Sequence, residues 1–111
     1  MDLAKKHCVP CEGGVKPFTS KQLEPYLVAA PGWLLAPDAK EISKQYRFKD
    51  FKAALAFVND IGAIAESEQH HPDIELSWGR VRVSLSTHAI KGLSENDFIL
   101  AVKIDQLKSA A

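Results

Sequence analysis

The chain of 111 residues is 46% hydrophobic and 25% charged, which fits one domain with a modest core and excludes an intrinsically disordered protein. Its 14 basic residues balance its 14 acidic residues without forming a basic cluster, so we expect no nucleic-acid partner and no membrane partner. No apolar run approaches the ~20 residues that span a bilayer, and no secretory signal opens the chain, so we expect a cytoplasmic location.

Residues 1–18 are rich in Cys, Pro, Gly and Lys and show no periodicity, which predicts an irregular arm before a domain of residues 19–111. Within this arm, His7, Cys8 and Cys11 are three candidate zinc ligands. A single Cys-x-x-Cys pair is a weak metal signal, and no fourth ligand is evident, so we expect no metal. In a reducing cytoplasm both cysteines are expected to remain thiols.

Hydrophobic periodicity predicts seven elements along the rest of the chain. Thr19 or Ser20 caps the first helix, and Pro25 inside it predicts a bent or short helix. Asp50 caps the second helix, which Pro72 prevents from continuing far. In chain order the predicted elements are a helix near 20–30, strands at 33–36 and 41–48, a helix from 51 to about 68, strands at 73–78 and 80–88, and a last helix that opens at Ser94.

The strand at 41–48 alternates apolar and polar residues, apart from Lys44 on its apolar side, and this predicts a strand with one face in solvent. The second helix has apolar residues at three- and four-residue steps, and its predicted buried stripe is Phe51, Ala54, Leu55, Val58, Ile61 and Ala65. Paired strands separated by helices indicate an α+β domain. We therefore predict a four-stranded antiparallel sheet with three helices on one face, in the order α-β-β-α-β-β-α.

The arrangement of histidines is the strongest chemical signal in the sequence. His70 and His71 are adjacent and precede Pro72, between a predicted helix and a predicted strand. If the two strands that follow pair about the turn at Gly79, their open ends meet and His88 lies across from the His70-His71 pair. Three imidazoles can then converge at one edge of the sheet.

Three interpretations of this cluster remain open from the residues alone. Imidazoles exchange protons near neutral pH, so they suit acid–base catalysis. Together with Glu66 they could also bind zinc, although the spacing matches no metal signature that is well established. In the simplest case they are polar loop residues that cap the end of a helix.

The pattern resembles that of the pterin-4a-carbinolamine dehydratase family, which is also known as the dimerisation cofactor of hepatocyte nuclear factor. The resemblance extends from about residue 19 to 108, and the arm resembles extensions in some bacterial-type members. Its motifs in this sequence are Glu66, His70-His71-Pro72, Trp78, His88 and Asp97 at the family's spacings, together with Phe48-Lys49-Asp50-Phe51, Ser86-Thr87-His88 and Gly92-Leu93-Ser94.

The resemblance implies an activity, namely loss of water from 4a-hydroxytetrahydropterin to give quinonoid dihydropterin during cofactor recycling for aromatic amino-acid hydroxylases. It implies no metal and no cofactor, a homodimer or homotetramer, and a hydroxylase as a further partner. Relatives that serve as a transcription-factor dimerisation cofactor or in RuBisCO assembly imply a different alternative, a non-catalytic interaction module.

The resemblance also implies roles for individual residues. His70, His71 and His88 would form the acid–base and pterin-binding trio, and Glu66 would orient one imidazole and favour its charged form. The residues implied at the substrate are Gln69, Pro72, Ser86, Thr87, Trp78 and Asp97. Two of these have simpler explanations that we favour: Asp97 as an acid in the first turn of the last helix, and Trp78 as a core residue on an alternating strand. Glu66 could equally be a solvated charge.

Overall fold

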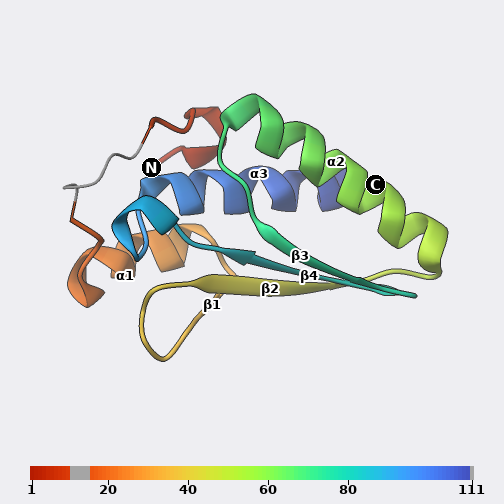
Figure 1. The fold of residues 1–111 in the computed structure, drawn as a ribbon, viewed down its shortest axis with the longest axis horizontal. Helices are drawn as coiled ribbons and strands as arrows, with labels where there is room; N and C mark the ends of the chain where they lie inside the picture. The colour runs from red at the N-terminus through yellow and green to blue at the C-terminus, as the bar shows by residue number, and fades with distance from the viewer. Residues whose placement is uncertain (11–15, 111) are drawn as a thin grey trace.

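The computed structural model describes residues 1–10 and 16–110, with the side chains of 1–10 and 16–108. The order of helices and strands confirms the predicted α-β-β-α-β-β-α arrangement, and two short 3₁₀ helices are added to it (Figure 1). The elements are η1 (Leu3–Lys5), α1 (Ser20–Ala29), β1 (Leu34–Leu35), β2 (Ile42–Arg47), α2 (Phe51–Glu68), β3 (Asp73–Ser77), β4 (Arg80–Leu85), η2 (His88–Ile90) and α3 (Glu95–Ala110).

The four strands form one antiparallel sheet in the order β1-β2-β4-β3. In the predicted hairpin, Ser77 pairs with Arg80 beside the turn, and Asp73 pairs with Ser84 near the open end. The segment that leads into β3 therefore lies beside the segment that leaves β4. This register places the two histidine-bearing stretches of the chain at the same end of the sheet.

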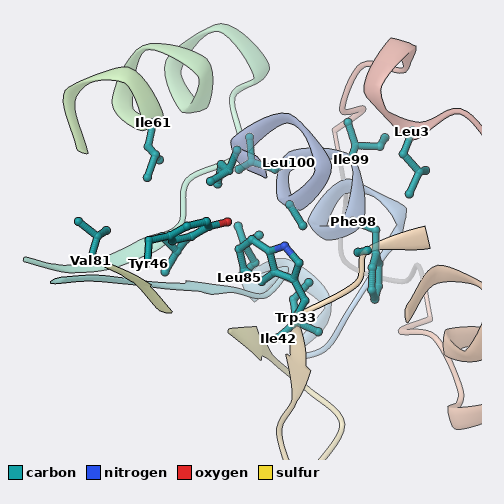
Figure 2. Close-up of a cluster of buried hydrophobic side chains, with 14 of the residues drawn as sticks. Leu3, Trp33, Ile42, Tyr46, Ile61, Val81, Leu85, Phe98, Ile99 and Leu100 are labelled. Carbon is teal, nitrogen blue, oxygen red and sulfur yellow. The ribbon is translucent and has the colours of Figure 1, made fainter. Parts of the chain in front are cut away.

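Helices α2 and α3 lie over one face of the sheet (Figure 1). The hydrophobic core is formed by residues of this face and of the two helices. Val81, Val83 and Leu85 alternate along β4 and are fully buried on this face. Figure 2 shows Val81 and Tyr46 on the sheet, with Ile61 of α2 across from them. No helix within the described ranges is long and apolar enough to cross a bilayer.

The helix caps form where the sequence predicts them. Thr19 and Gln22 make a reciprocal capping box, in which each side chain accepts a hydrogen bond from the other residue's backbone N–H. Asp50 accepts a hydrogen bond from the backbone N–H of Ala53 at 2.9 Å. The first helix has 10 residues and contains Pro25, in agreement with the predicted short helix.

The predicted stripe of α2 is partly wrong. Phe51 and Leu55 are exposed, at 45% and 39%, whereas Phe57 is buried. Phe57 packs against Tyr46 and Phe48 of the β2 region, with ring centroids 4.8 and 5.1 Å apart. These aromatic contacts orient the helix so that Phe57 faces the sheet, and a pattern of three- and four-residue steps alone could not choose between the two faces.

Lys44 interrupts the apolar side of β2 as the sequence predicts, and a carboxylate on α3 explains how it is accommodated. Its Nζ donates to Asp105 Oδ1 at 2.8 Å, and the same carboxylate accepts hydrogen bonds from Tyr46 Oη at 2.6 Å and from Trp33 Nε1 at 3.0 Å. Burial, together with the Asp105 carboxylate, raises the pKa of Tyr46 above its usual value, so the phenol remains a hydrogen-bond donor.

Residues 1–10 of the arm pack against the rest of the domain. They contain the 3₁₀ turn η1, and Leu3 is buried in the core. Lys103 Nζ of α3 donates to the carbonyl oxygen of Ala4 at 3.1 Å. Figure 1 shows this segment, in red, beside the end of α2 and the first turns of α3. Cys11, one of the candidate zinc ligands, lies outside the described residues.

Candidate active site

The chain turns sharply between α2 and β3, and this turn presents the adjacent histidines. Gln69 has the left-handed conformation, with φ 53° and ψ 38°, and its backbone N–H donates to Ala65 O. The backbone N–H of His70 also donates to Ala65 O, at 3.3 Å. A left-handed residue at this position ends a helix and changes the chain direction, so His70 and His71 are placed at the entrance to β3.

His70 is held by a buried carboxylate. Its Nε2 lies 2.7 Å from Asp97 Oδ1, and the His70 side chain is 12% exposed, whereas that of Asp97 is fully buried. The sequence favoured Asp97 as a helix-terminal acid, and it has this role too, because its Oδ2 accepts the backbone N–H of Ser94 at 3.0 Å. Asp97 therefore both caps the N-terminus of α3 and holds His70.

The other contacts of Asp97 define which nitrogen of His70 carries hydrogen. Thr87 Oγ1 donates to Asp97 Oδ2 at 2.8 Å, and Thr87 Oγ1 is itself 2.8 Å from Ser94 Oγ. Every partner of Asp97 in this network can donate, as expected for an ionised carboxylate, which only accepts. Nε2 of His70 therefore carries the hydrogen, and in the neutral ring Nδ1 is the nitrogen that can accept a proton.

His71 also contacts a carboxylate, but this pair is exposed to solvent. Its Nε2 lies 2.5 Å from Glu66 Oε2, and the two side chains are 55% and 74% exposed. Glu66 thus contacts one imidazole, as the family resemblance implies. An exposed pair of this kind orients a ring but stabilises the fold little.

His88 comes from the other strand of the hairpin. It opens η2 directly after Thr87, whose backbone N–H donates to Gly92 O at 2.8 Å and thereby closes the loop of residues 87–92. The loop bends back through Lys91, which is left-handed at φ 54°. His88 is exposed, and its position depends on the β4 register that the hairpin fixes.

All three imidazoles line one pocket of about 270 Å³. The hairpin register and the left-handed turn thus produce the convergence that the sequence predicts. The residues that line this pocket are Val9, Pro10, Gln69, His70, His71, Ser86, Thr87, His88, Ala89 and Asn96.

Several implied site residues lie elsewhere. Trp78 is 68% exposed at the hairpin turn, at the opposite end of β3 from the histidines, where it lines a separate pocket with Arg47 and Arg80. Its predicted place in the core is wrong, because the alternation of β3 ends where the turn begins. Pro72, Glu66 and Asp97 do not line the histidine pocket. Asp97 instead contacts His70, which lines the pocket.

Four lining residues were not anticipated. Ala89 follows His88 in η2, and Asn96 precedes Asp97 in α3, so both could have been found from their neighbours. Val9 and Pro10 belong to the aperiodic arm, and no local pattern in the sequence indicates that they reach the pocket.

The arm is anchored on Glu68, the last residue of α2. The Glu68 side chain is 6% exposed, its Oε1 accepts the backbone N–H of Cys8 at 2.7 Å, and its Oε2 lies 2.9 Å from His7 Nδ1 and 3.6 Å from Lys103 Nζ. Burial alone would raise the pKa of Glu68. The hydrogen bonds from Cys8 and His7 and the charge of Lys103 outweigh burial and lower this pKa.

The lowered pKa of Glu68 predicts that the arm releases in acid. A carboxyl group with a lowered pKa stabilises the folded arrangement above its usual value, here 4.5, and this stabilisation is lost as pH falls through the lowered value. We expect the NMR amide resonance of Cys8 to show a transition below pH 4.5, where Glu68 becomes protonated. Glu68→Gln should remove this transition, and far-UV circular dichroism over the same range separates arm release from global unfolding. A Cys8 resonance that titrates identically in Glu68→Gln would contradict the prediction.

Cys8 itself is held as a thiol. Burial, followed by the negative charge and hydrogen bond of Glu68, raises its pKa to about 12, and its Sγ lies 3.6 Å from Asn96 O. Zinc ligation and disulfide exchange both need a thiolate, so this environment is unfavourable for either reaction. Within the described parts of the chain, no three His, Cys, Asp or Glu side chains are grouped so that they could hold a metal ion.

A second pocket, larger than the histidine pocket, lies away from these groups. It measures about 490 Å³ and is formed by the start of α2 and the end of α3, with Phe48, Phe57 and Leu107 among its lining residues. Its charged groups include Asp60 and Lys108, but it has no imidazole and no pair of carboxylates. The smaller histidine pocket is therefore the candidate active site.

In this α+β domain, three imidazoles line a pocket at the open end of a hairpin, and imidazole is a group that exchanges protons near neutral pH. Comparison with known proteins gives the family. The chain belongs to the pterin 4 alpha carbinolamine dehydratase family, a family of dehydratase enzymes, whose model matches residues 16–107.

Similar proteins agree with this membership. A relative from Halorhodospira halophila, named as a pterin-4-alpha-carbinolamine dehydratase, is 50% identical over 107 residues, which cover 96% of this chain and 98% of the relative. A relative from Azoarcus sp. with the same name is 47% identical over 106 residues and covers 96% and 91%.

Two solved structures share the fold. A crystal structure described as a transcriptional coactivator/pterin dehydratase from Brucella melitensis aligns with a TM-score of 0.78 at 30% identity, covering 83% of this chain and 98% of that one. A pterin dehydratase-like protein identified as a RuBisCO assembly factor in the α-carboxysome aligns with a TM-score of 0.60, covering 69% and 89%. At 20% identity the second likeness shows the fold alone.

Proposed function

We propose that this protein dehydrates a 4a-hydroxytetrahydropterin to the quinonoid dihydropterin, with His70, His71 and His88 as its acid–base and pterin-binding groups. The observation that carries the proposal is the pocket of about 270 Å³ that all three imidazoles line. Membership of the dehydratase family supplies the substrate class. The reaction in this proposal uses no metal and no cofactor.

The reaction requires one proton to be delivered and one to be removed. An acid protonates the hydroxyl group at C4a, the C4a–O bond breaks, and water leaves. A base takes the proton of N5, and the electron pair of the N5–H bond forms the C4a=N5 double bond. No oxidant or reductant is needed, and imidazole performs both proton transfers near neutral pH.

His70 is the base in this scheme. Asp97 holds Nε2–H, so Nδ1 is the accepting nitrogen, and the buried carboxylate 2.7 Å from the ring stabilises the imidazolium that forms. His71 and His88 are more exposed and are available as the acid and as pterin-binding groups. Gln69, Ser86 and Thr87 complete the substrate contacts through side-chain or backbone atoms.

The physiological setting extends the same proposal. We expect cytoplasmic recycling of a tetrahydropterin for an aromatic amino-acid hydroxylase. We also expect a homodimer or homotetramer, since the open sheet has β3 as an exposed edge strand that a second copy can cover. Light scattering coupled to size exclusion measures this mass directly.

One assay tests the activity. A 4a-hydroxytetrahydropterin, generated in place by a hydroxylase, decays by itself in buffer, and its ultraviolet absorbance reports the decay. We expect purified protein to accelerate the decay in proportion to its concentration. If the protein binds 7,8-dihydrobiopterin but leaves the decay unchanged, it is a pterin-binding interaction module. If it neither binds nor accelerates, the pocket is not a pterin site.

A further inference from the structure

The N-terminal arm forms part of the histidine pocket, although it precedes the residues that the family model matches. We propose that residues 7–10 are a wall of the substrate site, that Val9 and Pro10 contact the bound pterin, and that Glu68 is the positioning residue that holds this wall. This inference rests on the proposed function, because it concerns the same pocket.

The arm is fixed beside the pocket by a two-way backbone contact. Asn96, which is 4% exposed, accepts the backbone N–H of Val9 at its Oδ1 at 3.0 Å and donates from Nδ2 to Val9 O at 2.6 Å. This arrangement resembles one rung of an antiparallel ladder and defines the position of Val9. Asn96 adjoins Asp97, so the first turn of α3 holds both the arm and His70.

The chemistry of the wall complements the rest of the pocket. The lining residues outside the arm are polar apart from Ala89, so they suit the hydrogen-bonding edges of a pterin. The backbone N–H and C=O of Val9 are both hydrogen-bonded to Asn96, while its side chain is 64% exposed and so offers apolar surface beside the pocket. A flat ring has apolar faces, and Val9 and Pro10 supply apolar surface for one of them.

Glu68 holds this wall from a distance. Glu68 does not line the histidine pocket. It contacts His7 and Cys8, the two residues that immediately precede Val9 in the chain. Substitution of Glu68 is therefore expected to loosen the arm, and with it Val9 and Pro10, while the histidines of the pocket stay unchanged. If pterin contacts the arm, bound pterin also stabilises the docked arm, because the coupling between the two is reciprocal.

The test compares full-length wild type with Glu68→Ala, and uses 7,8-dihydrobiopterin, which has no 4a-hydroxyl group to lose. We expect its Kd to rise about tenfold, as when the docked arm falls to about a tenth of the population. KM should rise in parallel while kcat changes less than about twofold, since the histidines are untouched. In wild type, saturation with 7,8-dihydrobiopterin should slow amide hydrogen exchange at Val9, whereas Glu68→Ala should accelerate it.

Two matched controls isolate the arm. Glu24→Ala removes an exposed glutamate on α1, and we expect it to leave Kd and KM unchanged. Val9→Ala should raise Kd about threefold through lost apolar contact, whereas Val28→Ala removes a valine that is 81% exposed on α1 and should have no effect. Thermal unfolding of each variant confirms that the domain is folded.

The outcomes distinguish this inference from the proposed function. If wild type binds 7,8-dihydrobiopterin and Glu68→Ala binds it equally well, the wall has no role in binding and the inference is wrong. If Val9 exchange is the same in Glu68→Ala as in wild type, Glu68 is not the positioning residue. If wild type neither binds nor dehydrates pterin, the proposed function itself fails.

Discussion

His70→Ala and His88→Ala are each expected to lower kcat for dehydration by about 10²–10⁴-fold, the usual contribution of a positioned acid or base. The fold should survive both changes. His88 is exposed, and removal of the His70 ring leaves Asp97 with hydrogen bonds from Thr87 and Ser94. Steady-state turnover measures the loss, and circular dichroism measures the fold.

Two further measurements sharpen this test. Free imidazole added to His70→Ala should restore part of the rate, because it can occupy the vacated space and accept the same proton. Arg82→Ala, on the polar face of the sheet, serves as a control that should retain wild-type kcat. Full activity in both histidine variants would refute the assigned site.

Asp97→Asn is expected to lower kcat by on the order of 10²–10⁴-fold although it preserves shape, since an amide can present Nδ2–H to His70 and leave the ring with the wrong tautomer. Asp97 does not line the pocket, so this loss would arise through His70. The pH profile of kcat should change as well, because the imidazolium that forms on His70 would face a neutral amide in place of the Asp97 carboxylate. A loss of packing alone would not move that profile.

The same substitution should reduce the free energy of unfolding by about 1–3 kcal/mol, because it weakens a fully buried acceptor with several donors. Urea denaturation measures this loss. Asp60→Asn, at an exposed position on α2, is the matched control and should change neither stability nor kcat. Wild-type kcat and an unchanged pH profile in Asp97→Asn would show that His70 does not depend on this carboxylate.

The order of elements and the meeting of the histidines could be predicted because both depend on local signals. Alternation defines each strand, Gly79 marks the hairpin turn, and a hairpin brings its open ends together whatever surrounds it. The contact between His70 and Asp97 was harder to predict from the sequence. An acid three residues after Ser94 is already explained by the start of a helix, and although the family resemblance implied Asp97 at the substrate, it did not indicate a contact with His70.

Two of the remaining differences arise from contacts between separate elements of the fold, and the third arises from a turn. The face that α2 buries is selected by Tyr46 and Phe48, and the periodicity of the helix does not contain that information. Trp78 continues an alternating pattern but falls at the turn, where the sheet no longer covers it. The docking of Val9 depends on Asn96, 87 positions further along the chain.

The sequence separation of these contacts has a consequence for how activity is acquired during folding. His70 and Asp97 are 27 residues apart, and Val9 and Asn96 are 87 apart, and both contacts converge on the first turn of the last helix. Contacts between distant residues form late, because long loops must close first. In stopped-flow refolding, the ability to bind pterin should therefore return only when that helix docks, so incompletely folded chains are inactive.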